Sequence, residues 1–222
     1  MQYSKINATQ LFSTIWHLIF VFCVKMSIFV KKSDMKTVWK PGTMIYPLPA
    51  VMVSCGATPD EYNIITISWT GTICTEPAMC YISVRPERHS YEIIKRTGEY
   101  VINLTTSKLA RATDWCGVKS GAEYKKFEAT GLTPVAATKV KAPLIKESPV
   151  NIECIVKDIK ELGTHHMFIS EVVAINAAES LIDKKSGLFR LNDSIPLCYS
   201  HGAYYEIGKF TGKFGFSVKK KK

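Results

Sequence analysis

Residues suited to bind an anion gather where a predicted strand gives way to a predicted helix. Ser83 and Arg85 end the strand, and His89 and Ser90 open the helix. Free amides at a helix start, the helix dipole and an arginine side chain can together bind a phosphate group. The same residues are equally compatible with a surface arginine and an ordinary helix cap. The sequence therefore offers a phosphate site as one of two interpretations.

A second group with chemical potential lies on the preceding predicted strand. Every second residue of a strand shares a face, so Thr66, Ser68 and Thr70 lie on one face of it, beside Trp69 and Gly71. Hydroxyls and backbone groups of this kind can hydrogen-bond the polar edge of a ligand. The sequence motifs G-x-G-x-x-G, G-x-x-x-x-G-K-[ST] and G-x-S-x-G are all missing. A Rossmann nucleotide site, a P-loop and a serine-hydrolase elbow are therefore unsupported.

The histidines and cysteines do not predict a metal site. His165 and His166 are neighbours on a predicted strand, so their side chains must point to opposite faces and cannot chelate one ion. The seven cysteines include no C-x-x-C pair, and their odd number argues against a disulfide framework. We expect reduced, mostly buried cysteines in a protein of the cytoplasm, without a bound metal.

The elements that must position these residues are mostly short strands. Period-two alternation, apolar runs and turn residues predict four strands, two helices and one long hairpin. Residues 162–164 form the turn of that hairpin. The second helix opens with Ser107 as its N-cap and carries a stripe of Leu109, Ala112 and Cys116. The strands are expected over 48–55, 62–70, 79–84 and 99–104, the first helix over 89–96, and the hairpin strands over 150–161 and 165–178. This pattern favours a closed antiparallel barrel over a parallel sheet.

Composition is that of one globular domain, or at most two small ones. The chain has 222 residues, of which 46% are hydrophobic and 22% are charged. The net charge is +10, but residues 1–34 contribute +3 and the four lysines of 219–222 contribute +4. The remaining body has a charge of only +3, so we expect basic tails and no nucleic-acid partner.

The N-terminal residues 1–34 differ from the rest of the chain. They contain the apolar run Leu11 to Val24, which Lys25 interrupts. A membrane anchor and a secretory signal are two interpretations, although the run is short for a bilayer and lacks a cleavage site. The third, which we favour, is an extension upstream of the true start. We therefore expect no membrane association, and a functional domain over 35–218 followed by the basic tail.

Several motifs, in order and spacing, resemble the flavin reductase-like family, in the flavoredoxin branch of the FMN-binding split-barrel proteins. The resemblance covers roughly residues 39–205. The motifs are Asn63-x-x-Thr66-x-Ser68-Trp69, Glu76-Pro77, Ser83-Val84-Arg85, His89-Ser90-Tyr91, Tyr100-Val101-Ile102-Asn103, Ser120-Gly121-x-x-x-Lys125-Lys126-Phe127-x-x-x-Gly131-Leu132, Glu147-Ser148-Pro149-Val150-x-Ile152-Glu153-Cys154 and His165-His166-x-x-Ile169-x-Glu171-Val172. One subgroup of the family has two prolines where this chain has Pro77 alone, which leaves the substrate branch open.

The resemblance implies a mainly β fold with flanking helices, a six-stranded antiparallel Greek-key split barrel. It also implies a homodimer that holds FMN, or the larger flavin FAD, near the subunit interface. Asn103 matches a position close to the cofactor, with a structural role equally open. Tyr199 and His201, with Tyr204, could cover the flavin or a nicotinamide, although packing is the commoner fate of such residues. The implied cofactor-binding residues are Thr66, Ile67, Ser68, Trp69, Thr70 and Gly71 along the ring, and Ser83, Val84, Arg85, His89 and Ser90, of which Ser83, Arg85, His89 and Ser90 would hold the phosphate.

The function implied is that of an NAD(P)H-dependent flavin reductase or a flavoredoxin-like electron carrier. Hydride would pass from NADH or NADPH to flavin N5, and then to a downstream acceptor or a monooxygenase. The flavin would carry this chemistry, so no catalytic side chain is predicted. A pyridoxamine-phosphate-oxidase-like enzyme is an alternative, but it would need a basic cluster for a second phosphate. A non-catalytic flavin-binding module is another.

Overall fold

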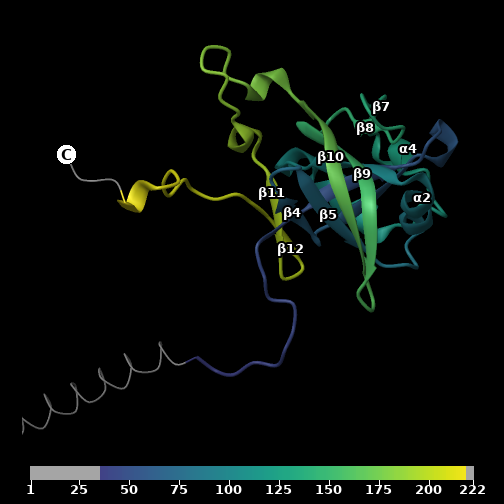
Figure 1. The fold of residues 1–222 in the computed structure, drawn as a ribbon, viewed down its shortest axis with the longest axis horizontal. Coiled ribbons are helices and arrows are strands. Elements are labelled where there is room, and N and C mark those ends of the chain that lie inside the picture. Colours follow the sequence, from purple (N-terminus) through teal and green to yellow (C-terminus); the bar gives the residue numbers. More distant parts are fainter. Residues whose placement is uncertain (1–35, 219–222) are drawn as a thin grey trace, which may run out of the picture. The chain divides into compact units, whose positions relative to one another are not determined.

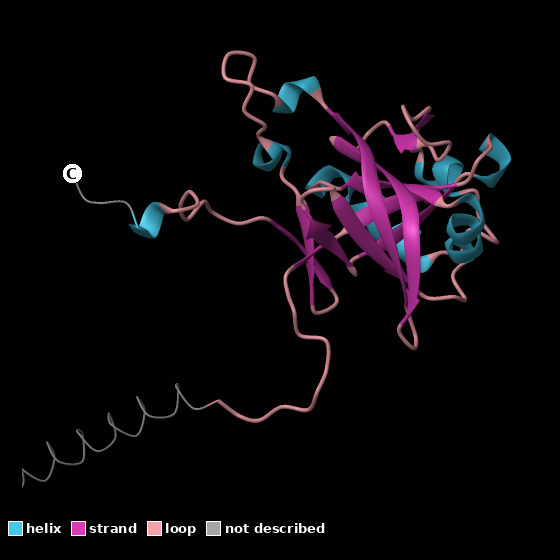
Figure 2. Cartoon of the chain, viewed as in Figure 1, coloured by secondary structure: helices cyan, strands magenta, loops and turns pink. Residues whose placement is uncertain are grey.

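The computed structural model describes residues 36–218, and its main feature is one curled antiparallel sheet (Figures 1 and 2). Every neighbouring pair of strands in it is antiparallel. The seven strands, in sheet order, are β3 (Asn63–Ile67), β2 (Val51–Cys55), β6 (Glu99–Leu104), β9 (Val150–Glu161), β10 (His166–Ala177), β5 (Met79–Val84) and β4 (Thr70–Cys74).

The sheet must curl because its two edge strands are consecutive in the chain. Only Ser68 and Trp69 separate the end of β3 from the start of β4, which lies at the opposite edge. The Thr70 N–H donates to the Ser68 carbonyl at 3.0 Å, and the Ser83 N–H donates to the Trp69 carbonyl at 2.8 Å. The mainly β split-barrel prediction is thus confirmed. Seven strands replace the expected six because the predicted strand 62–70 breaks at these two residues.

The barrel strands β2 and β3 are buried on both faces. Val51, Val53 and Ile65 pack inside the barrel, whereas Met52 and Ile64 face outward. Helices α3 (Ala110–Val118) and α4 (Lys126–Thr130) cover that outer face through residues that include Cys116 and Phe127. This double burial explains why residues 48–55 form an apolar run rather than an alternating one.

Both predicted helices are present with shifted boundaries, and the short helix α4 was not predicted. Helix α2 (His89–Thr97) ends at Gly98, whose φ of 69° suits glycine and whose N–H donates to the Ile94 carbonyl at 2.9 Å. The N-cap prediction for Ser107 is wrong, because this residue begins a 3₁₀ turn, Ser107–Leu109, and α3 starts at Ala110. The expected stripe of Leu109, Ala112 and Cys116 does face the core.

The predicted hairpin is confirmed as β9 and β10, the two longest strands (Figure 1). Beside the main sheet lies a small sheet in the order β1 (Leu48–Pro49), β11 (Leu197–Ser200) and β12 (Ala203–Glu206). The predicted strand 48–55 is therefore divided, since β1 pairs with β11 whereas β2 joins the barrel. A two-stranded ladder and four further short turns complete the elements: β7 (Pro134–Val135) and β8 (Leu144–Ile145), and the 3₁₀ turns Pro59–Glu61, Glu179–Leu181, Leu191–Ser194 and Phe216–Val218.

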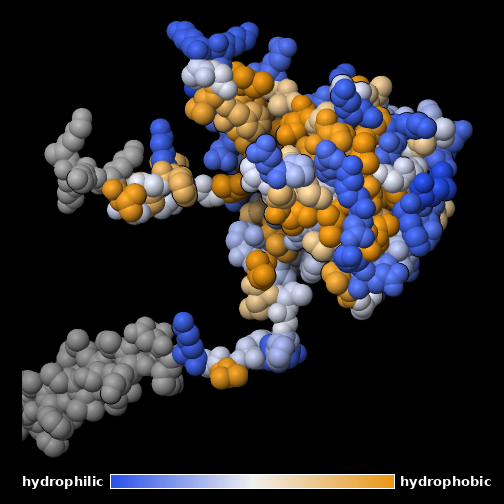
Figure 3. All heavy atoms as spheres, viewed as in Figure 1, coloured by the Kyte–Doolittle hydropathy of each residue, from blue (hydrophilic) through white to orange (hydrophobic). Residues whose placement is uncertain are grey.

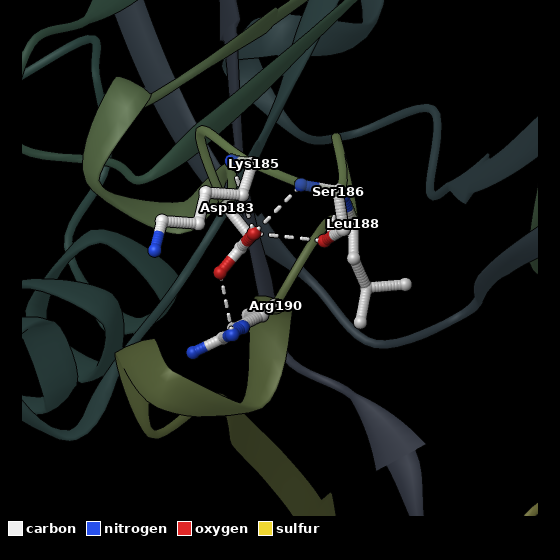
Figure 4. Close-up of polar contacts among 5 residues, drawn as sticks. All are labelled: Asp183, Lys185, Ser186, Leu188 and Arg190. Carbon is white, nitrogen blue, oxygen red and sulfur yellow. Dashed lines mark hydrogen bonds and ion pairs between the residues drawn. The ribbon is translucent and has the colours of Figure 1, made fainter.

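The connection from β10 to β11 is held by one aspartate (Figure 4). Asp183 accepts hydrogen bonds from the Ser186 N–H at 2.9 Å and the Ser186 hydroxyl at 2.8 Å, and from the Lys185 N–H at 3.2 Å. Its other oxygen pairs with Arg190 at 2.7 Å. The hydrogen bonds from Ser186 lower the pKa of the Asp183 carboxyl. These contacts order a long loop that leads into the small sheet.

The folded body begins at Ile45, and residues 36–44 form an exposed segment without helix or strand. Within residues 36–218, the helices are too short or too polar to span a bilayer. The apolar run Leu11 to Val24 lies outside the described residues.

Candidate functional site

Two adjoining cavities, which together we call the cleft, lie beside the point where β3 passes into β4. They share Ile65, Arg85 and Arg88 in their walls. We call the larger one, of about 350 Å³, the first chamber, and the other, of about 250 Å³, the second chamber. The cleft joins segments distant in sequence, because β3, the end of β5, the start of α2 and the face of α3 all contribute to it.

The first chamber combines strand backbone with aromatic side chains. Its barrel side runs through residues 66–69 and then Ser83, Val84 and Arg85. The Trp69 ring stacks on the His165 ring, with centroids 6.1 Å apart and planes inclined by 12°. The remaining wall comes from α3 and the small sheet, through Asp114, Gly117, Val118, Tyr199, Gly202 and Tyr204. A chamber with flat rings and backbone groups suits a planar, polar-edged ligand.

Charge in the first chamber is set by neighbouring groups. Burial lowers the pKa of His165, and the positive charges of Arg85 and Arg88 lower it further, so the imidazole is neutral at neutral pH. Burial raises the pKa of Tyr204 to about 12, with a further contribution from the Asp114 carboxylate. Both rings therefore remain uncharged walls. From the sequence, His165 was interpreted as an ordinary residue of the hairpin. Its contact with Trp69 could not be predicted, because the two residues are far apart in the chain.

Close packing fixes the barrel side of this chamber. A Cβ at Gly117 would lie 3.2 Å from the Thr66 Cβ, so α3 sits tightly on β3. The Thr66 hydroxyl donates to the Thr113 carbonyl of α3. Thr70 and Gly71 do not line the chamber, and the Thr70 hydroxyl donates instead to the Tyr81 carbonyl at 2.6 Å. The structure thus brings residues 66–69 to the cleft but not the last two of the predicted stretch.

The second chamber is basic. Four cationic side chains line it, with Glu87 as the acidic one: Arg85, Arg88, Lys119 and Lys126. His89 and Ser90, at the start of α2, also line it, so the structure brings Arg85 together with these two residues of the predicted anion site. Ser83, the fourth predicted residue, lines the first chamber instead. Arg85 pairs with Glu87 at 2.7 Å and is half-exposed. The Ser90 hydroxyl accepts a hydrogen bond from Asn63 at 2.8 Å.

Arg88, Lys119 and Lys126 were not predicted from the sequence as site residues, and of these three Lys126 is the buried one. It is only 3% exposed, and its ammonium donates to the Cys116 carbonyl at 2.7 Å. Burial lowers the pKa of Lys126, the Cys116 thiol opposes that shift, and the charge of Arg88 adds to it. An ammonium has three donors, and one protein acceptor satisfies one of them. A buried cation of this kind at a cavity wall is suited to an anionic ligand.

The loop after α3 closes this chamber through a glycine. A Cβ at Gly121 would lie 2.3 Å from the Asn63 side-chain oxygen, which is closer than real atoms approach. Ser120 and Gly121 can therefore lie directly against Asn63. The Ser120-Gly121 and Lys125-Lys126-Phe127 motifs were the signals that could have pointed to this wall.

Two other predicted residues lie away from the cleft. Asn103 is fully buried in the barrel wall, where its amide donates to the Met52 carbonyl and its oxygen accepts from the Ile145 N–H at 3.0 Å. Its structural role follows from these bonds. The His201 ring packs on the Tyr46 ring, with centroids 4.3 Å apart and planes inclined by 43°, and does not line either chamber. Of the expected cover, Tyr199 and Tyr204 reach the first chamber.

Comparisons with known proteins agree with this geometry. The family model for the flavin reductase like domain matches residues 43–208. A flavoredoxin of Desulfovibrio vulgaris is 29% identical, with a TM-score of 0.77 over 83% of this chain and 100% of that one. A flavoredoxin from Methanosarcina acetivorans, 24% identical, has the same fold, with a TM-score of 0.74 over 84% of this chain and 100% of that one. An uncharacterised protein of Pyrococcus abyssi is 32% identical over 63% of this chain and 80% of its own length.

Proposed function

The chain belongs to the flavin reductase like domain family, and from this premise we propose that it is an FMN-dependent oxidoreductase that takes hydride from NADH or NADPH. The relatives support flavin binding and oxidoreductase chemistry. The nicotinamide donor and the identity of the flavin as FMN belong to the proposal, together with a downstream acceptor or monooxygenase. We also propose a cytoplasmic site of action, which the six unpaired cysteines among the described residues support.

The second chamber fits the phosphate of FMN. The ammonium of Lys126 and the guanidinium groups of Arg85 and Arg88 would neutralise its charge. The N–H groups at the start of α2, next to His89 and Ser90, add donors and the positive end of the helix dipole. Lys119 and Lys126 line only this chamber, whereas the aromatic rings of Trp69, His165, Tyr199 and Tyr204 line only the first one. This polarity along one cleft suits a ligand with a flat ring and a charged end.

The first chamber fits the flavin ring. Backbone groups of residues 66–69 would bind its polar edge, and the stacked rings of Trp69 and His165 would bound it. Tyr199 and Tyr204 stand on the side of the small sheet, where they would limit the access of water. When bound, FMN supplies the chemistry of accepting a hydride and passing electrons on. The chain's own residues would orient the ring and bound it with side chains that stay uncharged, His165 and Tyr204 among them.

Lys126 is the observation that carries the proposal. A lysine this deeply buried needs a reason, because removing an ammonium from water is costly without a counter-charge. In this cleft it faces a cavity next to a helix start and two arginines. A phosphate there would provide the missing negative charge.

The test is to purify the full chain, record its visible absorbance and titrate it with FMN. We expect a flavin spectrum that bleaches under anaerobic conditions when NADH or NADPH is added. A colourless protein that takes up no FMN would overturn the proposal. Tight FMN binding without bleaching by either nucleotide would instead indicate a non-catalytic flavin module, and oxidation of pyridoxamine phosphate would indicate the other alternative.

A further inference from the structure

The small sheet of β1, β11 and β12 has two faces with different surroundings. Tyr199 and Tyr204 are directly opposite each other in its register, and both line the first chamber. The next pair, Cys198 and Tyr205, lines a separate groove. Side chains alternate along a strand, so these two pairs lie on opposite faces. The small sheet is therefore a wall shared by the candidate flavin site and the groove.

The groove is large and apolar. Its volume is about 680 Å³, which exceeds that of either chamber of the cleft. Tyr205 and Ile207 are half-exposed there. Among the described residues that line it, Glu206 alone carries a charge. Much of the remaining lining is aliphatic or proline, including Pro47, Pro49, Leu104, Leu191, Pro196 and Leu197.

The residues that follow β12 form an exposed arm whose apolar side chains are complementary to the apolar groove. We define the C-terminal arm as residues 209–218. Phe210, Phe214 and Phe216 are all exposed in it, and Figure 3 shows hydrophobic side chains along this part of the chain. Its sequence repeats Gly-Lys-Phe at 208–210 and 212–214, and its charges are the lysines 209 and 213. Aromatic side chains left this open are unusual in a monomer and typical of interfaces.

We propose that the groove binds the C-terminal arm of a second copy of this chain, so that two subunits exchange arms in a homodimer. One chain carries both halves of the contact, which is the requirement for a closed twofold interface. The exposed phenylalanines of the arm match the apolar lining of the groove. A homodimer was expected from the sequence, and the arm and the groove give it a specific contact.

The start of the arm explains why the occupant is a second copy. Ile207 and Gly208 belong to the rim of the groove, so the arm leaves from there, as Figure 1 shows beyond β12. Fully extended, its ten residues could span up to about 33 Å. A chain that starts on the rim has to reverse at once to enter its own groove, whereas an arm of this length can extend away from the body toward a second copy.

The arm exchange would also affect ligand binding in the cleft, an inference that rests on the proposed function. An arm on one face of the small sheet would support Tyr199 and Tyr204 on the other face. FMN binding and dimerisation would then strengthen each other, because coupling between two binding events is reciprocal. We expect FMN to tighten the dimer, and loss of the dimer to weaken FMN binding by about 10-fold or more.

Sedimentation velocity on the full chain tests the exchange without reference to flavin. The arm variant is Phe210→Asp with Phe214→Asp, and the groove variant is Tyr205→Asp. The control is Val135→Asp, an exposed apolar position on β7. We expect the wild type and the control to be dimers, and each variant to dissociate at least about 100-fold more readily. Circular dichroism will verify that all four chains fold.

Mixing the arm variant with the groove variant is the decisive step. The mixed dimer regains one intact pair, because the arm of the groove variant enters the groove of the arm variant. We therefore expect dimers to return on mixing. Variants that stay dimeric, or a mixture that stays monomeric, overturn the exchange. A dimer that behaves as expected but takes up no FMN would support the arm exchange and contradict the proposed function. A monomeric variant with unchanged FMN affinity would contradict the coupling between dimerisation and FMN binding.

Discussion

The two chambers of the cleft share three wall residues but differ in the rest of their lining. The first is bounded by strand backbone and by uncharged rings, with Trp69 stacked on His165. The second collects four cations around a helix start, one of them the buried Lys126. The difference indicates that one chamber binds by shape and the other by charge. Substitutions should therefore separate according to whether the ligand has a phosphate.

The largest effect is expected for Lys126→Met. The change keeps the volume of the side chain but removes the buried ammonium, and a charged hydrogen bond contributes about 1.5–3 kcal/mol. FMN affinity should fall by about 100-fold, whereas riboflavin, which lacks the phosphate, should bind as before. Fluorescence titration with both flavins measures this. Lys125→Met, at the exposed neighbouring lysine, is the matched control and should change neither affinity.

Replacing the aromatic wall should affect both flavins alike. In Trp69→Leu the stack on His165 is lost, while the apolar volume is largely kept. Aromatic pairs contribute about 0.5–1.5 kcal/mol beyond burial, so with the lost ring surface we expect affinities for FMN and riboflavin to fall by about 10- to 30-fold. The same titrations provide the readout. A loss confined to FMN would assign Trp69 to the phosphate instead.

Arg85→Ala should resemble Lys126→Met but with a smaller effect. The arginine is half-exposed and pairs with Glu87, so solvent and that carboxylate already screen its charge. We expect FMN affinity to drop by about 10-fold and riboflavin affinity to stay unchanged. Arg96→Ala, which removes a surface arginine paired with Glu61, serves as the control. An equal loss for both flavins would place the phosphate elsewhere.

The smallest expected effect is a pH dependence of FMN binding. Burial lowers the pKa of Lys126 in the free protein, and only the protonated form attracts the phosphate. FMN affinity should therefore decline as the pH rises from neutral through this lowered pKa, while riboflavin affinity stays level. Titrations above pH 7 avoid the protonation of the phosphate itself, whose pKa is about 6. In Lys126→Met the slope should disappear, and a slope that persists would assign it to another group.

The local sequence pattern was sufficient to predict most strands of the barrel, but it was not sufficient to predict the walls of the cleft. Strand β6 was predicted with its observed bounds, because its turn residues and apolar run are adjacent in sequence. The break at Ser68 and Trp69 was missed, since the alternation of Ile65, Ile67 and Trp69 continues across it. Only closure of the sheet, a long-range event, forces the turn there.

The same distinction explains the site residues. Arg85, His89 and Ser90 were found because a helix start has a local signature. Lys126 was not found, because two adjacent lysines, Lys125 and Lys126, usually both lie in solvent. The burial of Lys126 depends on how α3 and α4 pack, which the local sequence does not reveal. His165 likewise becomes a wall of the first chamber through contact with Trp69, nearly a hundred positions earlier in the chain.

Phosphorus NMR of protein-bound FMN tests most directly whether the phosphate lies in the second chamber. A phosphate held by Lys126, Arg85 and Arg88 should remain dianionic, because nearby cations favour its charged form. We predict that its chemical shift stays constant from about pH 8 to pH 5, through the pKa of a free phosphate near 6. In Lys126→Met loaded with FMN the shift should begin to move with pH. A wild-type resonance that titrates like free FMN would contradict the account.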